Sequence, residues 1–473
     1  MVWIPIFTEE EGRYFSFYCN TTKEELSVFS GKELWGSLVL QTCHHAPSIR
    51  KLVVAVGAMS LHVKQAGNTA QKAVREPNPV FSKYHYQFAL HQYALAIKLM
   101  RESLASGQEN IRHVLLWSLL INCFETYNGD HATASNHALW GLKALSYWAD
   151  TKRYITNQPL RLRSPAPNLV EDDIVHAFNT IDCYLMTARD SRSKESHKQA
   201  LAVMQDSVTN MPAKFATVQE GKSYWNLILQ RFLRFLKTAL KPQDEIADLD
   251  ESHARPLTGN ISSGLVDERN RIMKDLLHWD AAFQPVFERS QTPVGRGDRM
   301  STAVLRADTK MWLVTMQVAL KSDIEVLYDD HLSTFQEALS LVKTCCEEWE
   351  LRGIATGPRL TSEVGVIPCL VRIALQCRDR AVRYEALHLL RKYPCQEGIW
   401  DSCTCAAAAT AVVEFEEASR EGGFIPAESR LGVTSLSCLM LHWNQGVLLK
   451  DQDMKLSHLH HASQMLFCTE DYQ

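Results

Sequence analysis

Four side chains that could move protons follow the strongly apolar stretch 114–124: Glu125, Tyr127, His131 and His137. A carboxylate placed directly after an apolar run is expected to be partly buried, and burial is one way in which a protein makes a general acid. The same residues could instead pack two helices together, with Glu125 hydrogen-bonded to a neighbouring helix and His137 as its partner. We favour packing and keep acid–base catalysis as the alternative.

His44 and His45 form an adjacent pair just before an expected helix that begins with Pro47. Two imidazoles could transfer protons or bind a metal ion. Neighbouring residues point in different directions on a helix or a loop, so a shared chemical role is not expected. We predict a structural or capping role, and His44 joins the catalytic candidates only if the chain is an enzyme.

The chain contains 13 cysteines, an odd number, and none of them forms a C-x2-C pair. Zinc sites usually place ligands two to four residues apart on a loop. The densest cysteine group consists of Cys369, Cys377, Cys395, Cys403 and Cys405. Its members are more widely spaced than zinc ligands usually are, except for Cys403 and Cys405, which form a C-x-C in an expected alanine-rich helix. We therefore predict reduced thiols in an intracellular protein, with no metal and no cofactor.

Several common classes of protein lack their usual signatures here. The sequence has no G-x-x-x-x-G-K-[ST], G-x-G-x-x-G, G-x-S-x-G or H-E-x-x-H motif. Its 50 Lys and Arg residues balance 54 Asp and Glu residues, a net charge of -4 that gives no bulk basis for binding nucleic acid. The longest apolar stretch is about half of what a membrane span needs, so no membrane association is expected.

Apolar residues recur at helical spacing along most of the chain, as in Ile174, Phe178, Ile181 and Leu185. Only 21 Gly and 16 Pro residues occur among 473, which favours long helices with few turns. We predict an all-α fold, a large multi-helix assembly of antiparallel helix pairs with a weaker indication of repeat-like stacking. The expected organisation is a single helical domain over 1–473, with loops near 68–79, 150–173, 241–264 and 291–299.

The expected helices span most of the chain. They are 47–66, 80–106, 110–127, 131–149, 171–190, 222–240, 265–289, 301–319, 323–346, 364–377, 380–393, 399–420 and 433–449.

The segment 364–402 carries an ordered set of residues: Ile367, Pro368 and Leu370, then Cys377, Arg378 and Asp379, then Arg383, Ala386, Leu389 and Leu390, and finally Glu397, Gly398, Trp400, Asp401 and Ser402. This order resembles a segment near the end of the fungal-specific regulatory domain of six-cysteine zinc-cluster transcription regulators. Two earlier segments, 34–58 and 93–141, are similar to further elements of that family. The three segments occur in the order that the family shows.

The resemblance implies a helical effector domain that senses a metabolite or a protein partner and controls a tethered DNA-binding module. The residues shared with the family are expected to have structural roles. Arg378, Asp379 and Arg383 could form an ion-pair network between consecutive helices, and Glu397 to Trp400 and Asp401 would mark a turn with an aromatic anchor. Gly141 would permit close approach of helices.

The sequence also departs from the family. The six cysteines of the zinc cluster are not among the 13, and Arg380 stands where the family usually has proline. We therefore expect no direct DNA binding from this chain. The leading hypothesis is a nuclear regulator-like effector, truncated or naturally without the cluster, that controls secondary-metabolic genes through a small-molecule effector or a protein partner such as a full-length regulator.

Two alternatives stay open. The first is a cytoplasmic biosynthetic enzyme of the same fold that dehydrates, isomerises or cyclises a metabolite, using Glu125, Tyr127, His131, His137 or His44 on a small-molecule substrate. The second is a purely structural interaction scaffold. A deep apolar pocket that holds a buried carboxylate or His without a nearby partner would favour the enzyme or a metabolite-sensing regulator, and an interior without a cavity would count against both.

Overall fold

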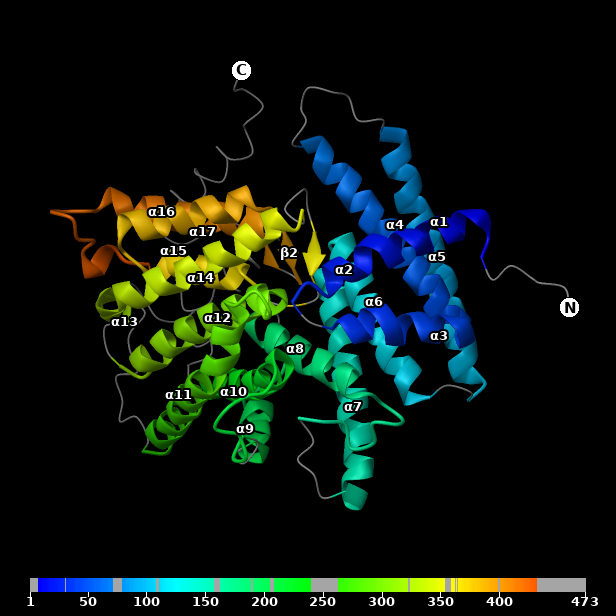
Figure 1. The fold of residues 1–473 in the computed structure, drawn as a ribbon, viewed down its shortest axis with the longest axis horizontal. Helices are drawn as coiled ribbons and strands as arrows, with labels where there is room; N and C mark the ends of the chain where they lie inside the picture. Colours follow the sequence, from blue (N-terminus) through cyan, green and yellow to red (C-terminus); the bar gives the residue numbers. More distant parts are fainter. Residues whose placement is uncertain are drawn as a thin grey trace, which may run out of the picture. The chain divides into compact units, whose positions relative to one another are not determined.

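A computed structural model describes residues 7–29, 31–70, 79–107, 110–156, 162–188, 190–204, 208–239, 263–321, 324–353, 359–361, 363, 365–398 and 400–431. Over these residues the chain is almost entirely helical, which confirms the all-α prediction (Figure 1). The chain clusters into two compact units, the first formed by 1–185, 356–364 and 395–399 and the second by 186–355, 365–394 and 400–473. The single-domain organisation stays a prediction.

The first unit is built mainly from the N-terminal helices, drawn in blue to teal in Figure 1. They are α1 (Glu9–Phe17), η1 (Tyr18–Thr22), α2 (Lys23–Leu26), η2 (Leu34–Leu38), α3 (Val39–His45), α4 (Pro47–Ala70), α5 (Pro79–Ala105), α6 (Ile111–Asn128), α7 (His131–Thr156) and most of α8 (Asp172–Ala188). The long helices pack as neighbours in the chain, α4 along α5 and α6 along α7. The predicted pairing of helices over 80–149 is therefore seen for α6 and α7.

Local sequence signals fix the ends of these helices. Thr8 and Glu11 form a capping box at the start of α1, in which each side chain bonds to the other residue's backbone. The side chain of Asn110 caps α6, and Gly129 ends that helix with a φ of 80°, a left-handed conformation that glycine adopts without strain. The Asn128-Gly129 turn therefore sets where α6 stops and α7 begins.

The second unit contains the helices drawn in green to orange in Figure 1. They are α9 (Lys194–Val203), α10 (Val218–Ala239), α11 (Ser263–Ser290), η4 (Arg296–Asp298), α12 (Arg299–Val318), α13 (Ile324–Leu327), η5 (Tyr328–His331), α14 (Leu332–Leu351), α15 (Ile367–Gln376), α16 (Arg380–Lys392), α17 (Ser402–Ala418) and η6 (Ala427–Ser429). Helices α15, α16 and α17 pack against one another, and α14 packs against α12, α15 and α16.

Three two-residue strands accompany the helices. In the first unit β1 (Leu360–Thr361) pairs in parallel with β2 (Gln396–Glu397), with Leu360 opposite Gln396. In the second unit β3 (Trp400–Asp401) leads directly into α17. The sequence did not predict these strands, because two residues are too few to show an alternating pattern.

Most predicted helices match observed ones to within a few residues, but short helices were missed. The elements α1 to α3 and α9 were not predicted. The expected loop over 150–173 is shorter, because α7 continues to Thr156, whereas the loop near 291–299 is present and contains η4. The expected helix 433–449 and nearly all of the expected loop 241–264 lie outside the described residues.

Candidate functional site

The first candidate group surrounds the buried carboxylate of Glu125 on α6, which is 6% exposed. Tyr93 of α5 hydrogen-bonds to this carboxylate, and its ring stacks on Phe124 with centroids 4.2 Å apart. Asn128 donates from Nδ2 to Glu125 Oε2 at 3.3 Å, and Tyr86 of α5 donates to Asn128 Oδ1 at 3.2 Å. The carboxylate therefore sits in a chain of neutral hydrogen-bond donors.

Burial and the charge of Glu125 shift the pKa of two neighbouring side chains, Tyr93 and His137. Burial raises the pKa of Tyr93, and the adjacent Glu125 carboxylate raises it further. Burial lowers the pKa of His137 on α7, whereas Glu125 acts in the opposite direction. His137 was the expected partner of Glu125, yet the groups that bond to the carboxylate are Tyr93 and Asn128. Neither was predicted, because Tyr93 lies on another helix and Asn128 lies at the turn that ends α6.

Tyr127 points away from Glu125 although only two residues separate them. Two residues correspond to about 200° of rotation around a helix, so the two side chains leave on opposite sides. The Tyr127 hydroxyl faces Ser60 of α4 and is close to Glu25 of α2, and burial raises its pKa. Glu125 and Tyr127 therefore do not form one site.

The two remaining candidates lie at helix ends. His131 is the first residue of α7, where the preceding Asp130 accepts a hydrogen bond from the Thr133 N–H at 3.0 Å. His44 is exposed in the last turn of α3, with its ring centroid 6.4 Å from that of His45. His44 and His45 lie just before α4, which begins at Pro47 as predicted. They also end the unpredicted helix α3, whose next residue, Ala46, is extended because a residue before proline is restricted to such conformations.

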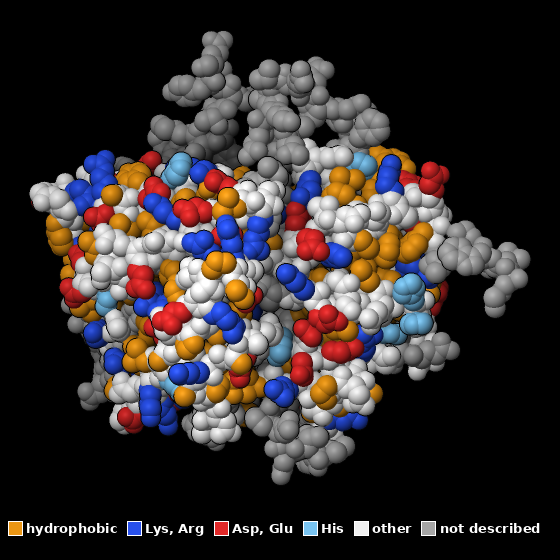
Figure 2. All heavy atoms as spheres, viewed as in Figure 1, with side chains coloured by type: hydrophobic (Ala, Val, Ile, Leu, Met, Phe, Trp, Pro, Cys, Tyr) orange, Lys and Arg blue, Asp and Glu red, His pale blue; other side chains and the backbone are white. Residues whose placement is uncertain are grey.

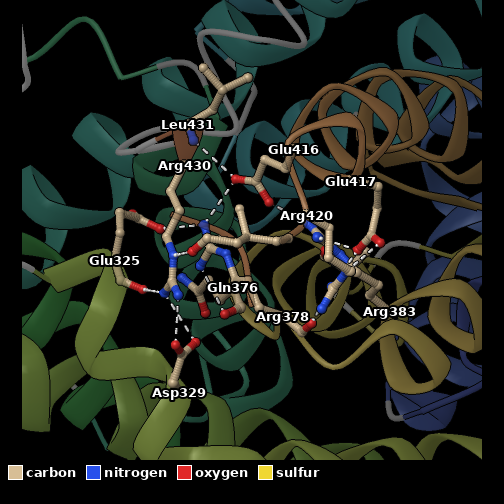
Figure 3. Close-up of polar contacts among 12 residues, drawn as sticks. Glu325, Asp329, Gln376, Arg378, Arg383, Glu416, Glu417, Arg420, Arg430 and Leu431 are labelled. Carbon is tan, nitrogen blue, oxygen red and sulfur yellow. Dashed lines mark hydrogen bonds and ion pairs between the residues drawn. The ribbon is translucent and has the colours of Figure 1, made fainter. Parts of the chain in front are cut away.

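The second group is a buried ion-pair network in the second unit (Figure 3). Arg383 of α16 is fully buried and contacts Glu416 Oε2 at 2.6 Å and Glu417 Oε1 at 3.1 Å, both on α17. Arg378 contacts the other oxygen of Glu416 at 3.0 Å and Glu325 of α13 at 2.7 Å. Two guanidinium groups therefore share one carboxylate that is itself fully buried.

The network continues into the segment after α17. Arg430 is buried and makes a two-pronged ion pair with Asp329 of η5, at 3.0 and 2.7 Å. It also donates to the Glu325 carbonyl at 2.7 Å, and the Leu431 N–H donates to Glu416 at 3.0 Å (Figure 3). Arginine's planar fork suits such paired contacts, so this network ties α13, η5, α16 and α17 to the chain that follows.

The other residues of the family-like motif cap helices or fill the core. Asp379 caps α16 by accepting the Val382 N–H at 3.0 Å, and Asp401 caps α17 by accepting the Thr404 N–H at 2.7 Å. Glu397 and Trp400 are buried. The expected network includes Arg378 and Arg383 as predicted, but its acids come from α13 and α17, whereas Asp379 serves as a cap.

The pKa directions in this network fit a structural role. Burial raises the pKa of Glu325, with Arg378 opposing it. Burial also acts to raise the pKa of Glu417, but Arg420 and Arg383 outweigh it and hold that pKa below the ordinary value. The ionised form of Glu417 is therefore favoured by its arginine partners. Glu416 and Glu417 could have been noticed in the sequence as carboxylates at the end of an alanine-rich helix, whereas Glu325 lies on α13 and no local pattern marks it.

Charge is spread over the surface without a dominant sign on the face drawn in Figure 2, where Lys and Arg alternate with Asp and Glu. Among the described residues, no group of three or more His, Cys, Asp or Glu side chains is arranged to hold a metal ion. No helix within the described ranges is long and apolar enough to cross a membrane.

Two glycines of the earlier family-like segments lie where helices nearly touch. A Cβ at Gly57 of α4 would lie 2.4 Å from the Tyr14 carbonyl oxygen, and one at Gly141 of α7 would lie 2.3 Å from Ser118 Oγ. Residues 13–176, which include both glycines, match the family model described as the fungal specific transcription factor domain. The chain carries a fungal-specific transcription factor domain. This domain lies within the first compact unit.

A relative extends the similarity beyond this transcription factor domain. The chain is 20% identical to the aspercryptin biosynthesis cluster-specific transcription regulator atnN of Emericella nidulans, over an alignment of 470 positions that covers 84% of this chain and 72% of the relative. No solved structure gave a significant match. The domain and the relative together support a transcription-regulator-like role for the chain.

Proposed function

We propose that this chain is a nuclear effector of a fungal transcription regulator, which controls metabolic genes by binding a protein partner or a small-molecule effector. The observation that carries the proposal is the fungal-specific transcription factor domain over 13–176. The relative, a regulator specific for a biosynthesis cluster, supports metabolic genes as the targets.

An exposed aromatic pair on α7 supports binding of a protein. Trp140 is 68% exposed and Tyr147 is 77% exposed, and the two are seven residues apart on one face of the helix. Lys143 lies over the Trp140 ring, 5.1 Å from its centroid. Large aromatic side chains are enriched at the centres of protein interfaces, where they contribute much of the binding energy. We therefore place the protein contact of the proposal on this face.

The charge balance supports action without direct DNA binding. Protein–DNA affinity depends strongly on Lys and Arg contacts to phosphates, whereas this chain has a net charge of -4. Recruitment to DNA by a full-length regulator would supply the missing contacts. Binding of the isolated chain to DNA with a steep salt dependence would contradict this part of the proposal.

The geometry around Glu125 favours a structural role for that group over catalysis. The carboxylate already bonds to Tyr93 and Asn128, and Tyr127 lies on the opposite side of α6. These bonds hold the Glu125 carboxylate between two helices, which fits packing. We therefore propose a structural role for Glu125.

Deleting the gene in the fungus that encodes it and measuring transcripts genome-wide tests the proposed function. We expect the transcripts of a set of metabolic genes to change and to be restored by the wild-type chain. A double substitution of Trp140→Ala and Tyr147→Ala should fail to restore them while the protein accumulates normally. Unchanged transcripts after deletion would overturn the regulatory function.

Tyr384→Ala is the matched control for this experiment. Tyr384 is also a partly exposed aromatic residue, at 37%, but lies on α16 of the second unit. It should restore the transcripts as well as the wild-type chain does. Full restoration by the α7 double variant would place the protein contact elsewhere.

A further inference from the structure

Three arginines of the second unit converge on a single acid, Glu348, near the end of α14. Arg296, Arg299 and Arg352 lie 3.4, 3.2 and 3.7 Å from the carboxylate of Glu348. Glu348 is their only acidic partner within the described part of the chain. Three positive charges therefore meet one negative charge, which leaves an excess of two.

Other acidic residues do not neutralise the excess positive charge of the three arginines. Glu350 is engaged by Tyr393 and Lys392, and Glu288 accepts a hydrogen bond from Gln284. Asp298 precedes α12 without capping it, and Glu347 is exposed on α14. None of these four carboxylates pairs with the three arginines within the described residues.

The arginines are held in place and remain reachable from solvent. Arg352 donates to the carbonyls of Arg296 and Gly297 at 3.2 and 3.3 Å, which fixes the turn that carries Arg296. The turn is tight: a Cβ at Gly295 would lie 2.1 Å from the Arg289 carbonyl oxygen. The arginine side chains are 56%, 34% and 33% exposed for Arg296, Arg299 and Arg352.

One further feature favours an anion at this place. Arg299 Nε is buried and has no hydrogen-bond partner in the structure. The arginine cluster therefore presents an unused buried donor together with its excess positive charge.

We propose that Arg296, Arg299 and Arg352 bind a phosphate group, carried by a small metabolite or by a phosphorylated side chain of a protein partner. A phosphate monoester carries a charge of about -1.5 to -2 at pH 7, which matches the excess of two. Its oxygens accept the paired N–H groups of guanidinium. The site is separate from the α7 face, which belongs to the other unit, and it does not depend on the proposed gene-regulatory function.

Titration of the full chain with phosphoserine, followed by calorimetry at pH 7 and fixed ionic strength, tests the proposal. We expect saturable binding that equimolar chloride does not reproduce. Arg296→Ala removes the most exposed of the three arginines and should weaken binding about tenfold, the effect of losing one charge-assisted hydrogen bond. Absence of saturable binding, or equal affinity in Arg296→Ala, would overturn the proposal.

Two additions make the experiment decisive. Arg380→Ala removes a 70% exposed arginine on α16, so it matches the charge change and should leave the affinity unchanged. An equal loss of affinity in this variant would show only non-specific attraction and overturn the site.

A phosphoserine peptide and its unphosphorylated form distinguish the two sources of the phosphate group, a protein partner and a metabolite. At least tenfold tighter binding of the phosphopeptide than of phosphoserine indicates a protein partner, and equal affinity indicates a metabolite.

Discussion

The two polar groups of this molecule both bury a carboxylate, but they compensate it differently. Glu416 in the second unit meets two guanidinium groups, whereas Glu125 in the first unit meets a phenol and an amide. Removing one ion from a buried pair leaves an uncompensated charge, which is far more costly than losing one neutral hydrogen bond. Glu416 therefore depends on its arginine partners far more than Glu125 depends on its neutral donors.

The largest effect is expected from Arg383→Ala. The substitution leaves Glu416 buried with one guanidinium fewer and also removes a contact to Glu417. We expect a loss of about 3–5 kcal/mol in the free energy of unfolding of the second unit, measured by urea denaturation. Arg380→Ala, at an exposed position on the same helix, should cost less than about 0.5 kcal/mol. Equal effects would mean that the network is not what stabilises this unit.

Gly141→Ala tests the packing of the first unit and should have the next largest effect. The added methyl group would lie 2.3 Å from Ser118 Oγ and 2.5 Å from Phe178 Cε1. Overpacking of this kind costs about 1–3 kcal/mol, which a thermal melt would detect. Gly12→Ala in α1 is the control, because nothing lies within 4 Å of its Cβ position, and it should be neutral or slightly stabilising.

Tyr93→Phe should cost about 1 kcal/mol at pH 7, the contribution of one hydrogen bond. The substitution also changes the alkaline pH dependence. Burial and Glu125 raise the pKa of Tyr93 above its ordinary value of 10.0, so the unfolded chain releases this proton first as the pH rises. Its stabilising contribution is complete below about pH 10 and is lost above it.

Measuring the free energy of unfolding from pH 8 to 11 checks the direction of this pH dependence. The decline above pH 10 should be shallower in Tyr93→Phe than in the wild-type chain. The exposed Tyr147→Phe should change neither the stability at pH 7 nor the shape of the decline. A steeper decline in Tyr93→Phe would show that the phenol is not held by burial and Glu125.

The smallest effect on stability is expected from Trp140→Ala. The side chain is 68% exposed, so its loss should change the free energy of unfolding by less than about 0.5 kcal/mol. Calorimetric melting checks this expectation. A loss above 2 kcal/mol would mean that Trp140 supports the fold, and the α7 face would then not serve as a free contact surface.

Much of the helical fold could be predicted from the sequence, because apolar spacing reports directly on helix faces. Pro47 and the Asn128-Gly129 turn also placed helix ends correctly. The short helices at the N-terminus were missed because a few residues do not define a period. The role of Gly141 in close packing was predicted and is confirmed by its contact distances.

The candidate sites were predicted less completely. The arginines at 378 and 383 were identified, but their partners Glu325, Glu416 and Glu417 lie 33 to 53 residues away along the chain, and no local pattern links them. Asp379 became a helix cap because its position before α16 satisfies a free N–H group. Tyr93 was missed as the partner of Glu125 because only tertiary packing brings α5 against α6.

The proposed function rests most directly on whether the chain changes transcription when it is brought to a promoter. The full chain would be fused to an unrelated DNA-binding domain and tested on a reporter gene in a fungal host, with Trp140→Ala/Tyr147→Ala as the surface variant. We expect the wild-type fusion to change reporter output several-fold and the variant to lose this effect at equal protein level. An inert wild-type fusion that is folded and nuclear would contradict the account.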